Sequence, residues 1–299
     1  MSYNELFVSQ QNTFSGFQTP FEQADYVILG VPFDVTSTYR TGARFGPAAI
    51  RQASLNIETY SFRTELDVED LKLHDLGDLH ISTDTRKTLA TLQNVITDIL
   101  KVGKTPITIG GEHTITLGIM KSVCAKAPKT AIVSFDAHLD LRGEFLDLRV
   151  SHATFMRRIH EEMDQAKIIE VGTRAVCKEE LAYAKKAKIE FLTSHQIRKD
   201  GSEEIARQLE DKLAEFHGCY LSVDMDVLDP AFAPGAQNPE PDGIDTNTLL
   251  NILCRICGRK IAGFDVVEVA PQYDSGVSAI QAAKVIFEML CCLEKSRKA

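Results

Sequence analysis

Residues 105–140 read TPITIGGEHTITLGIMKSVCAKAPKTAIVSFDAHLD, and this stretch contains the pattern that decides the fold. Two apolar runs, Thr105–Ile109 and Ala131–Phe135, are each followed closely by ionisable residues. Both runs are nearly continuous in apolar and β-branched side chains, as expected for strands buried on both faces of a sheet. Such strands are typical of parallel sheets that are covered by helices.

Six further runs of the same character lie on either side of this stretch: Asp25–Val31, Leu71–Leu76, Lys167–Val171, Lys188–Leu192, Cys219–Val223 and Ile261–Val267. Helical periodicity between them predicts four helices: Thr85–Val102, Glu203–Phe216, Thr246–Cys257 and Ser278–Leu293. Alternation of strands and helices along the whole chain predicts an α/β fold. We expect a single domain over residues 1–299, with three α/β/α layers and an eight-stranded parallel sheet.

Composition narrows the class of protein. The net charge of −9 argues against binding to nucleic acid or to an anionic membrane surface, because both require positive charge. A small cationic substrate is compatible with this negative net charge. The N-terminus does not resemble a signal peptide, and the sequence contains no apolar stretch long enough to span a bilayer. Seven scattered cysteines, an odd number, indicate a reduced, cytoplasmic location.

Ionisable residues follow four of the predicted strands. They lie in the segments Gly110-Gly111-Glu112-His113, Asp136-Ala137-His138-Leu139-Asp140, Asp224-Met225-Asp226 and Glu268-Val269-Ala270-Pro271. The carboxyl ends of parallel strands meet at one edge of a sheet, where ligands bind. Gathering so many carboxylates there is unfavourable unless something compensates their charge. The pattern therefore predicts a metal site at this edge.

Charge counting favours two metal ions over one. Asp136, Asp140, Asp224 and Asp226 supply four negative charges, which two divalent cations would neutralise. A shared carboxylate would hold such a pair about 3.5–4 Å apart. The oxygen-rich ligand set favours Mn²⁺ over zinc. Since same-face residues on a strand lie roughly 6.6 Å apart, the loop after Asp136 must curl so that His138 and Asp140 point back.

Each piece also has a simpler structural interpretation. Gly110-Gly111 is typical of a tight turn, and His113 of a capping or core histidine. Asp224-x-Asp226 is also good turn chemistry. The Asp-x-His-x-Asp run over residues 136–140 is the motif that most strongly indicates a metal site. Its alternative interpretation is a solvated acidic turn. Taken together, the four strand ends favour a metal site.

These segments resemble the arginase/agmatinase (ureohydrolase) family. Gly30-Val31-Pro32-Phe33-Asp34, residues 42–47 (GARFGP) and residues 222–230 (SVDMDVLDP) match it too, so the resemblance spans about residues 30–274. It implies an eight-stranded parallel sheet, a trimeric or hexameric assembly and two Mn²⁺ ions. One ion would be held by His113, Asp136, Asp140 and Asp224. The other would be held by Asp136, His138, Asp224 and Asp226, with Asp136 and Asp224 bridging.

The resemblance also implies catalytic roles for three residues. A metal-bridging hydroxide would attack the guanidinium carbon while Glu268 holds the guanidinium, and Asp140 or a neighbouring ligand would pass a proton to the leaving amine. His152 would return a proton from solvent, since the pKa of histidine lies near working pH. The residues alone favour a surface histidine for His152, and allow a strand-end carboxylate paired with an arginine for Glu268. Asp75 and Asp78 also match family positions, and we interpret them as loop-capping residues.

Two segments, residues 232–235 (FAPG) and 238–241 (NPEP), resemble the agmatinase branch, and the loop after Asp140 lacks the carboxylate clamp of arginases. The implied substrate is agmatine or an N-substituted agmatine, cut into urea and putrescine or the corresponding polyamine. A hydrolase of guanidino-carboxylates, such as guanidinobutyrate or formimidoylglutamate, is the alternative, because Arg142 could pair with a substrate carboxylate. A non-catalytic regulatory member of the fold that binds a partner protein is a third hypothesis.

Overall fold

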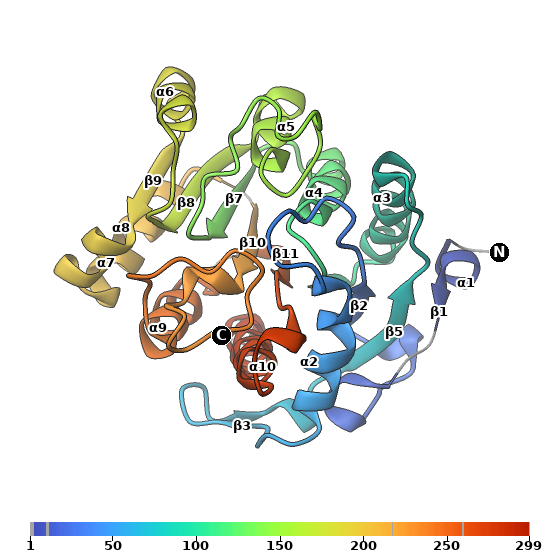
Figure 1. Ribbon diagram of the computed structural model, residues 1–299. Coiled ribbons are helices and arrows are strands. Elements are labelled where there is room, and N and C mark those ends of the chain that lie inside the picture. The colour runs from blue at the N-terminus through green and yellow to red at the C-terminus, as the bar shows by residue number, and fades with distance from the viewer. Residues whose placement is uncertain (1–2, 10–11, 217, 259, 299) are drawn as a thin grey trace.

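The computed structural model describes residues 3–9, 12–216, 218–258 and 260–298 of the 299-residue chain. A nine-stranded sheet forms the centre of the molecule, in the order β1-β5-β2-β6-β11-β10-β7-β8-β9 (Figure 1). In that order the strands are β1 (Val8–Ser9), β5 (Leu73–Leu79), β2 (Tyr26–Val31), β6 (Thr105–Gly110), β11 (Ile261–Val267), β10 (Gly218–Asp224), β7 (Thr130–Phe135), β8 (Lys167–Thr173) and β9 (Glu190–Thr193).

The eight strands from β5 to β9 pair in parallel, which confirms the predicted sheet. The ninth strand, β1, lies antiparallel against the edge strand β5. It was not predicted, because two residues cannot show an alternating pattern. A small antiparallel pair of β3 (Tyr60–Ser61) and β4 (Leu66–Asp67) was missed for the same reason. That residues 1–299 form a single domain stays a prediction.

Helices cover both faces of the sheet and enclose two hydrophobic cores, so the three-layer prediction is confirmed (Figure 1). One face carries α2 (Gly46–Ser54), α7 (Ser194–Asp200), α8 (Ser202–Leu213), α9 (Thr246–Ile256) and α10 (Val277–Lys298). The other carries α3 (Thr85–Lys101), α4 (Ile115–Lys126), α5 (Phe155–Glu162) and α6 (Lys178–Ala187), and α1 (Tyr3–Phe7) packs against α3. No helix in the described part of the chain is long and apolar enough to cross a membrane.

The four helices predicted from periodicity are α3, α8, α9 and α10. The remaining helices in the described part of the chain were not predicted, and α4 shows one reason. Its residues from Ile115 to Met120 are all buried, so the helix has no polar face to create a periodic pattern. The short helix α5 has only eight residues, which is two turns. Tertiary packing, more than local pattern, stabilises helices of this kind.

Asp75 and Asp78 have a role beyond the predicted one of loop-capping residues. Both lie within β5, where they form ion pairs with Arg51 of α2. The Arg51 side chain is fully buried, with Nε 2.7 Å from Asp75 Oδ2 and Nη1 2.5 Å from Asp78 Oδ1. A buried guanidinium needs carboxylate partners to offset its desolvation. The two aspartates therefore join α2 to the sheet. Asp75 also accepts the main-chain amides of Phe14 and Gly77 at 2.8 and 2.9 Å, so it has a capping role as well, whereas the side-chain contact found for Asp78 is the one with Arg51.

The strand order places the predicted functional residues together. The four strands that precede them, β6, β11, β10 and β7, are direct neighbours at the centre of the sheet. The strand register brings these residues to the same level of the sheet, because Val223 pairs with Phe135 and Asp224 pairs with Val267. Asp136, Asp224 and Glu268 therefore emerge side by side from the carboxyl edge of the sheet.

Candidate active site

Four buried aspartates lie at the carboxyl ends of β7 and β10. Asp136 follows β7, Asp224 is the last residue of β10, and Asp226 lies in the short 3₁₀ turn Met225–Val227. Main-chain amides orient the carboxylates: His138 N donates to Asp136 Oδ1 at 2.6 Å, and Asp226 N donates to Asp224 Oδ1 at 2.8 Å. These bonds fix one oxygen of each carboxylate and direct the other toward the centre of the site.

The loop after Asp136 curls back, as its spacing requires. His138 Nδ1 lies 3.0 Å from Asp226 Oδ2 and 3.4 Å from Asp136 Oδ1. Asp140 Oδ2 lies 3.8 Å from His113 Nδ1. Asp140 has a φ of 50°, in the left-handed region that is uncommon for residues other than glycine. This backbone reversal returns the Asp140 carboxylate to the cluster.

The hydrogen bonds of Ser222 determine which ring nitrogen of His113 carries the proton and which one carries the lone pair. Nε2 lies 2.8 Å from Ser222 Oγ, and the Ser222 hydroxyl donates to Asp265 Oδ1 at 2.5 Å. Since that hydroxyl has a single proton, Ser222 Oγ accepts from Nε2–H. Nδ1 then carries a lone pair, and it lies 3.0 Å from Asp136 Oδ2 and 3.2 Å from Asp224 Oδ2. A backing partner of this kind orients histidine ligands in metal sites.

The electrostatics show that this cluster requires positive charge. Burial by itself lowers the pKa of His113, but the facing Asp136 and Asp224 carboxylates raise it well above the ordinary histidine range. The pKa of His138 is raised in the same way beside Asp226. Burial and the neighbouring aspartates raise the pKa of Asp224 as well. In the absence of cations the cluster would therefore hold protons, which bound metal ions would displace.

The donor set fits two metal ions. Ligand atoms of His113, Asp136 and Asp140 all lie within 4.8 Å of one another, and so do those of Asp136, His138 and Asp226. The two groups share Asp136. His113 Nδ1 is buried and has no hydrogen-bond partner among the described residues, although carboxylate oxygens surround it. Lone pairs that face one another in this way are stabilised by a cation between them.

Glu268 lies directly after β11 and is 2% exposed. Its Oε1 accepts a hydrogen bond of 2.6 Å from the main-chain amide of His113, whereas its buried Oε2 has no partner in the described part of the chain. Burial, with the charges of Asp224 and Glu112, raises the pKa of Glu268 well above its ordinary value. A cationic group beside Oε2 would stabilise the ionised carboxylate. The structure shows no pairing of Glu268 with an arginine among the described residues.

His152 lies just before α5 and is 8% exposed, so it is not the surface histidine that the residues alone favoured. Thr36 and Thr38, from the loop after β2, lie 3.4 Å from its Nδ1 and Nε2 respectively. Burial, together with the nearby His138, lowers the pKa of His152 to about 4. This corrects the expectation of a value near working pH, because the neutral imidazole dominates there.

A cavity of about 490 Å³ opens over the cluster, and Asp140, His138, Asp224, Asp226, Glu268 and His152 all line it. Farther out, its wall includes Arg142, Phe145, Glu180 and Glu240. The Arg142 guanidinium lies over the Phe145 ring at 4.9 Å, and its Nε is 4.0 Å from Glu180, beyond hydrogen-bond distance. Glu240 Oε1 lies 3.9 Å from His138 Nε2. The outer wall thus contains the Arg142 cation and the Glu240 carboxylate, whose partners Glu180 and His138 lie 4.0 and 3.9 Å away.

Sequence reasoning missed two supporting residues of this site. Asp265, buried within β11, accepts from Tyr220 and Thr116 as well as from Ser222. An acidic residue in the middle of an apolar strand was the available signal. Arg174, just after β8, donates to several main-chain carbonyls at the end of β10 and in the 240–241 loop. Its only signal was its position after a strand.

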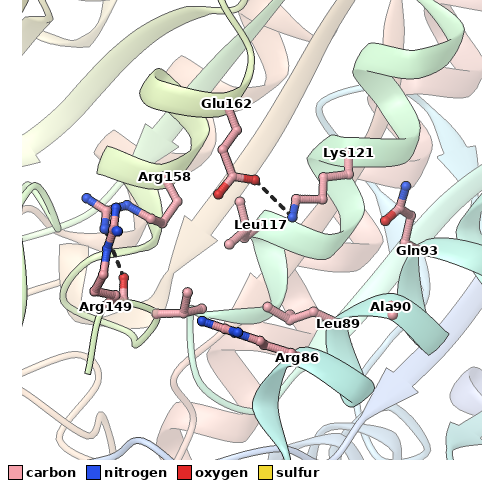
Figure 2. Close-up of a pocket in the computed structure, with 10 residues that line it drawn as sticks. Arg86, Leu89, Ala90, Gln93, Leu117, Lys121, Arg149, Arg158 and Glu162 are labelled. Atoms are coloured by element: carbon pink, nitrogen blue, oxygen red, sulfur yellow. Dashed lines mark hydrogen bonds and ion pairs between the residues drawn. The ribbon is translucent and has the colours of Figure 1, made fainter. Parts of the chain in front are cut away.

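A second cavity, of about 380 Å³, lies between α3, α4 and α5, and Figure 2 shows its lining. Its charged groups largely pair with their surroundings: Lys121 Nζ lies 2.9 Å from Glu162, and Arg158 donates to the Arg149 carbonyl at 3.2 Å. It shares no lining residue with the first cavity. Most of the ionisable site residues predicted from the sequence therefore line the first cavity, and none of them lines this one.

Comparison with known proteins assigns the family. The model of the Arginase family matches residues 24–292, nearly the whole chain. The chain belongs to this family, and it is a hydrolase of the ureohydrolase type, which confirms both the resemblance and the prediction of an enzyme.

Individual relatives are similar over almost their full length. Agmatinase of Bacillus subtilis is 34% identical over 296 residues, which cover 97% of this chain and 98% of that protein. The crystal structure of agmatine ureohydrolase of Thermoplasma volcanium superimposes with a TM-score of 0.90 at 32% identity, covering 97% of both chains. Formimidoylglutamase of Bacillus subtilis gives a TM-score of 0.86 at 28% identity, covering 98% of this chain and 92% of that one.

Proposed function

We propose that this protein hydrolyses a guanidino compound to urea and an amine, with two Mn²⁺ ions as cofactor. The observation that carries the proposal is Glu268: it lines the same cavity as the proposed metal ligands, and its buried Oε2 has no partner in the described part of the chain. A carboxylate in that position would accept hydrogen bonds from the planar N–H groups of a guanidinium. His113, Asp136, His138, Asp140, Asp224 and Asp226 are the proposed metal ligands.

When bound, the two cations would neutralise the aspartates and activate a water molecule as the nucleophile. The residues of the chain account for the remaining requirements. Glu268 would bind and orient the guanidinium, and the burial of its carboxylate would strengthen that interaction. Asp140, which lines the cavity, would accept the proton released by the nucleophile and deliver it to the leaving nitrogen. His152, neutral at rest, would accept a proton from solvent and then donate it to the leaving amine.

Agmatine, or an N-substituted agmatine, is the proposed substrate. Its guanidinium would lie against Glu268, and its far-end ammonium requires an acceptor at the outer wall. Glu240 meets that requirement, since it lines the cavity with a side chain that is 43% exposed. The agmatinase and agmatine ureohydrolase among the similar proteins support this choice.

A guanidino-carboxylate is a second candidate, and Arg142 is the observation that favours it. The guanidinium lines the cavity and lies beyond hydrogen-bond distance of Glu180, so its N–H groups are accessible to a substrate carboxylate. A formimidoylglutamase among the similar structures shows that this fold also serves a different substrate. The outer wall decides between the two candidates, and the metal chemistry is common to both.

A urea-release assay with Mn²⁺ tests the proposal across agmatine, aminopropylagmatine, arginine and guanidinobutyrate. We expect rapid release from agmatine or aminopropylagmatine. Failure to release urea from any of them would favour the non-catalytic hypothesis, in which the fold binds a partner protein. Clustered buried aspartates have no evident use in such a binding module, which is why we favour an enzyme.

Three further parts of the proposal need separate measurements. Elemental analysis of protein purified without added metal tests the preference for Mn²⁺. Light scattering coupled to size-exclusion chromatography tests the proposed homotrimer or homohexamer. Fractionation of the native host tests the cytoplasmic location. Neither nucleic acid nor a membrane is part of the proposed function.

A further inference from the structure

Two threonines lie against the ring of His152, one at each nitrogen. Thr36 Oγ1 lies 3.4 Å from Nδ1 and also accepts the main-chain amide of His152 at 3.1 Å. Thr38 Oγ1 lies 3.4 Å from Nε2, on the side that lines the cavity. The imidazole is thus fixed between a buried hydroxyl and a hydroxyl at the cavity.

A buried carboxylate lies behind Thr36. Glu112 is fully buried, and four donors point to its two oxygens: Thr36 N at 2.8 Å, Ser37 Oγ at 3.2 Å, Thr114 Oγ1 at 2.5 Å, and the Thr36 hydroxyl. Burial raises the pKa of Glu112 to about 7, but the hydrogen bonds from Thr114, Thr36 and Ser37 act against burial and favour the ionised carboxylate, whose two oxygens accept all four. Glu112 is therefore an acceptor in this network.

Close packing of two loops makes this contact possible. A Cβ atom added to Gly111 would lie 1.9 Å from the carbonyl oxygen of Phe33, so only glycine fits there. The amide of Glu112 donates to that same carbonyl at 2.7 Å. The loop after β2 can therefore approach the end of β6, and Thr36 reaches Glu112.

The direction of these hydrogen bonds fixes the imidazole. Since the single hydroxyl proton of Thr36 is donated to Glu112, Thr36 Oγ1 can only accept from His152. A neutral imidazole has one N–H, and this arrangement places it on Nδ1. We propose that Glu112 and Thr36 are positioning residues that hold His152 in the Nδ1–H tautomer, with the Nε2 lone pair directed to the cavity. This inference rests on the proposed function for the role of His152 but not for its tautomer.

Nitrogen NMR of the ring tests the tautomer directly. The full-length protein would carry ¹⁵N-labelled histidine and be saturated with Mg²⁺, a diamagnetic cation, and a His152→Gln variant would assign the signals. We expect a protonated Nδ1 and an unprotonated Nε2 in the wild type. Thr36→Val keeps the side-chain shape but removes the hydroxyl, and it should shift His152 toward the other tautomer. Thr36→Ser should restore the wild-type pattern, and Ser37→Ala, which loses a donor to Glu112 away from His152, should leave it unchanged.

Kinetics complete the test. Because general acid–base catalysis depends on the correct protonation of the catalytic group, Thr36→Val should lower kcat roughly tenfold with KM little changed, and Thr36→Ser should recover most of the loss. A Thr36→Val variant that keeps the Nδ1–H tautomer would overturn the inference. A variant that changes tautomer without any loss of kcat would support the positioning role of Thr36 and overturn the proposed catalytic role of His152. Failure of the proposed function is distinct, since the wild type would then release no urea while its NMR pattern remained as described.

Discussion

Two buried clusters of carboxylates at the sheet solve the same electrostatic problem differently. In β5, Asp75 and Asp78 pair with the buried guanidinium of Arg51, so that cluster carries its own cation. At the ends of β7 and β10, by contrast, four aspartates face two imidazoles. Among the described residues those aspartates form no ion pair with a lysine or arginine. The first cluster is complete within the chain, and the second requires cations from outside.

The difference teaches how to separate structural acids from functional ones. Both kinds match positions of the family, and both are buried, so neither resemblance nor burial distinguishes them. The presence of a counter-ion within the chain, such as Arg51, does distinguish them. An acid cluster with a buried arginine stabilises the fold, whereas one without it indicates a site for an external cation.

The largest expected effect comes from the cluster that lacks its own cation. Asp136→Asn removes a charge that both metal-binding groups share, so activity should fall at least about 10³-fold, roughly 4 kcal/mol in the transition state. The fold should remain, because the change also relieves repulsion among the aspartates. Steady-state urea release and circular dichroism of the variant measure the two parts. Near-normal turnover would contradict the two-metal proposal.

Breaking the other cluster should affect stability. Arg51→Met leaves Asp75 and Asp78 without their buried partner, which should lower the free energy of unfolding by about 3–5 kcal/mol. Denaturant titration measures this change. Arg207→Met is the matched control, because Arg207 is 57% exposed and pairs only at the surface, so its removal should change stability by less than about 1 kcal/mol. Equal effects in the two variants would remove the distinction between the clusters.

Chelation should affect stability through the aspartate cluster. Protein stripped of metal should melt at a lower temperature, and Mn²⁺ at about 100 times its Kd should restore roughly 2.7 kcal/mol per site. In a chain of 299 residues that corresponds to a shift of roughly 4 °C per site. Differential scanning calorimetry with and without Mn²⁺ measures it, and Asp136→Asn is the control, with a smaller response. A melting curve that verified metal removal leaves unchanged would count against the site.

The smallest expected effect concerns the substrate. We expect kcat/KM for agmatine to exceed that for arginine at least about tenfold, or roughly 1.4 kcal/mol. Arg142→Ala should leave the agmatine value nearly unchanged, because the proposed far-end acceptor is Glu240. Parallel assays with guanidinobutyrate provide the comparison. A wild-type preference for guanidinobutyrate that disappears in Arg142→Ala would reverse the choice of substrate and leave the hydrolytic chemistry in place.

The sequence predicted the central architecture because the relevant signals are local. Buried parallel strands are continuous apolar runs, and all eight runs became strands. The proposed metal ligands follow such runs at short spacing, and the structure gathers them at one edge. Resemblance supplied the remaining information for His152, whose neighbours along the chain carry no sign of burial. Its environment comes from Thr36, more than a hundred residues away.

What the sequence could not provide depends on contacts between distant segments. The two aspartates of β5 looked like turn residues until the partner from α2 was known. The lowered pKa of His152 follows from its burial, which no local pattern records. The position of Arg142 at the cavity places its guanidinium over the nearby Phe145 ring and 4.0 Å from Glu180 of α6, which is distant in the sequence. Such features follow from tertiary packing, so they had to come from the structure.

The backbone at Asp140 and Glu268 has a consequence for protein engineering. Both residues occupy the left-handed region, with φ values of 50° and 68°, and both add negative charge to a buried, acidic neighbourhood. Glycine would relieve the strain and the repulsion at once. In protein grown without metal, a selection for heat resistance alone would therefore favour glycine at these positions and discard catalysis, so libraries of this enzyme should be screened for turnover and stability together.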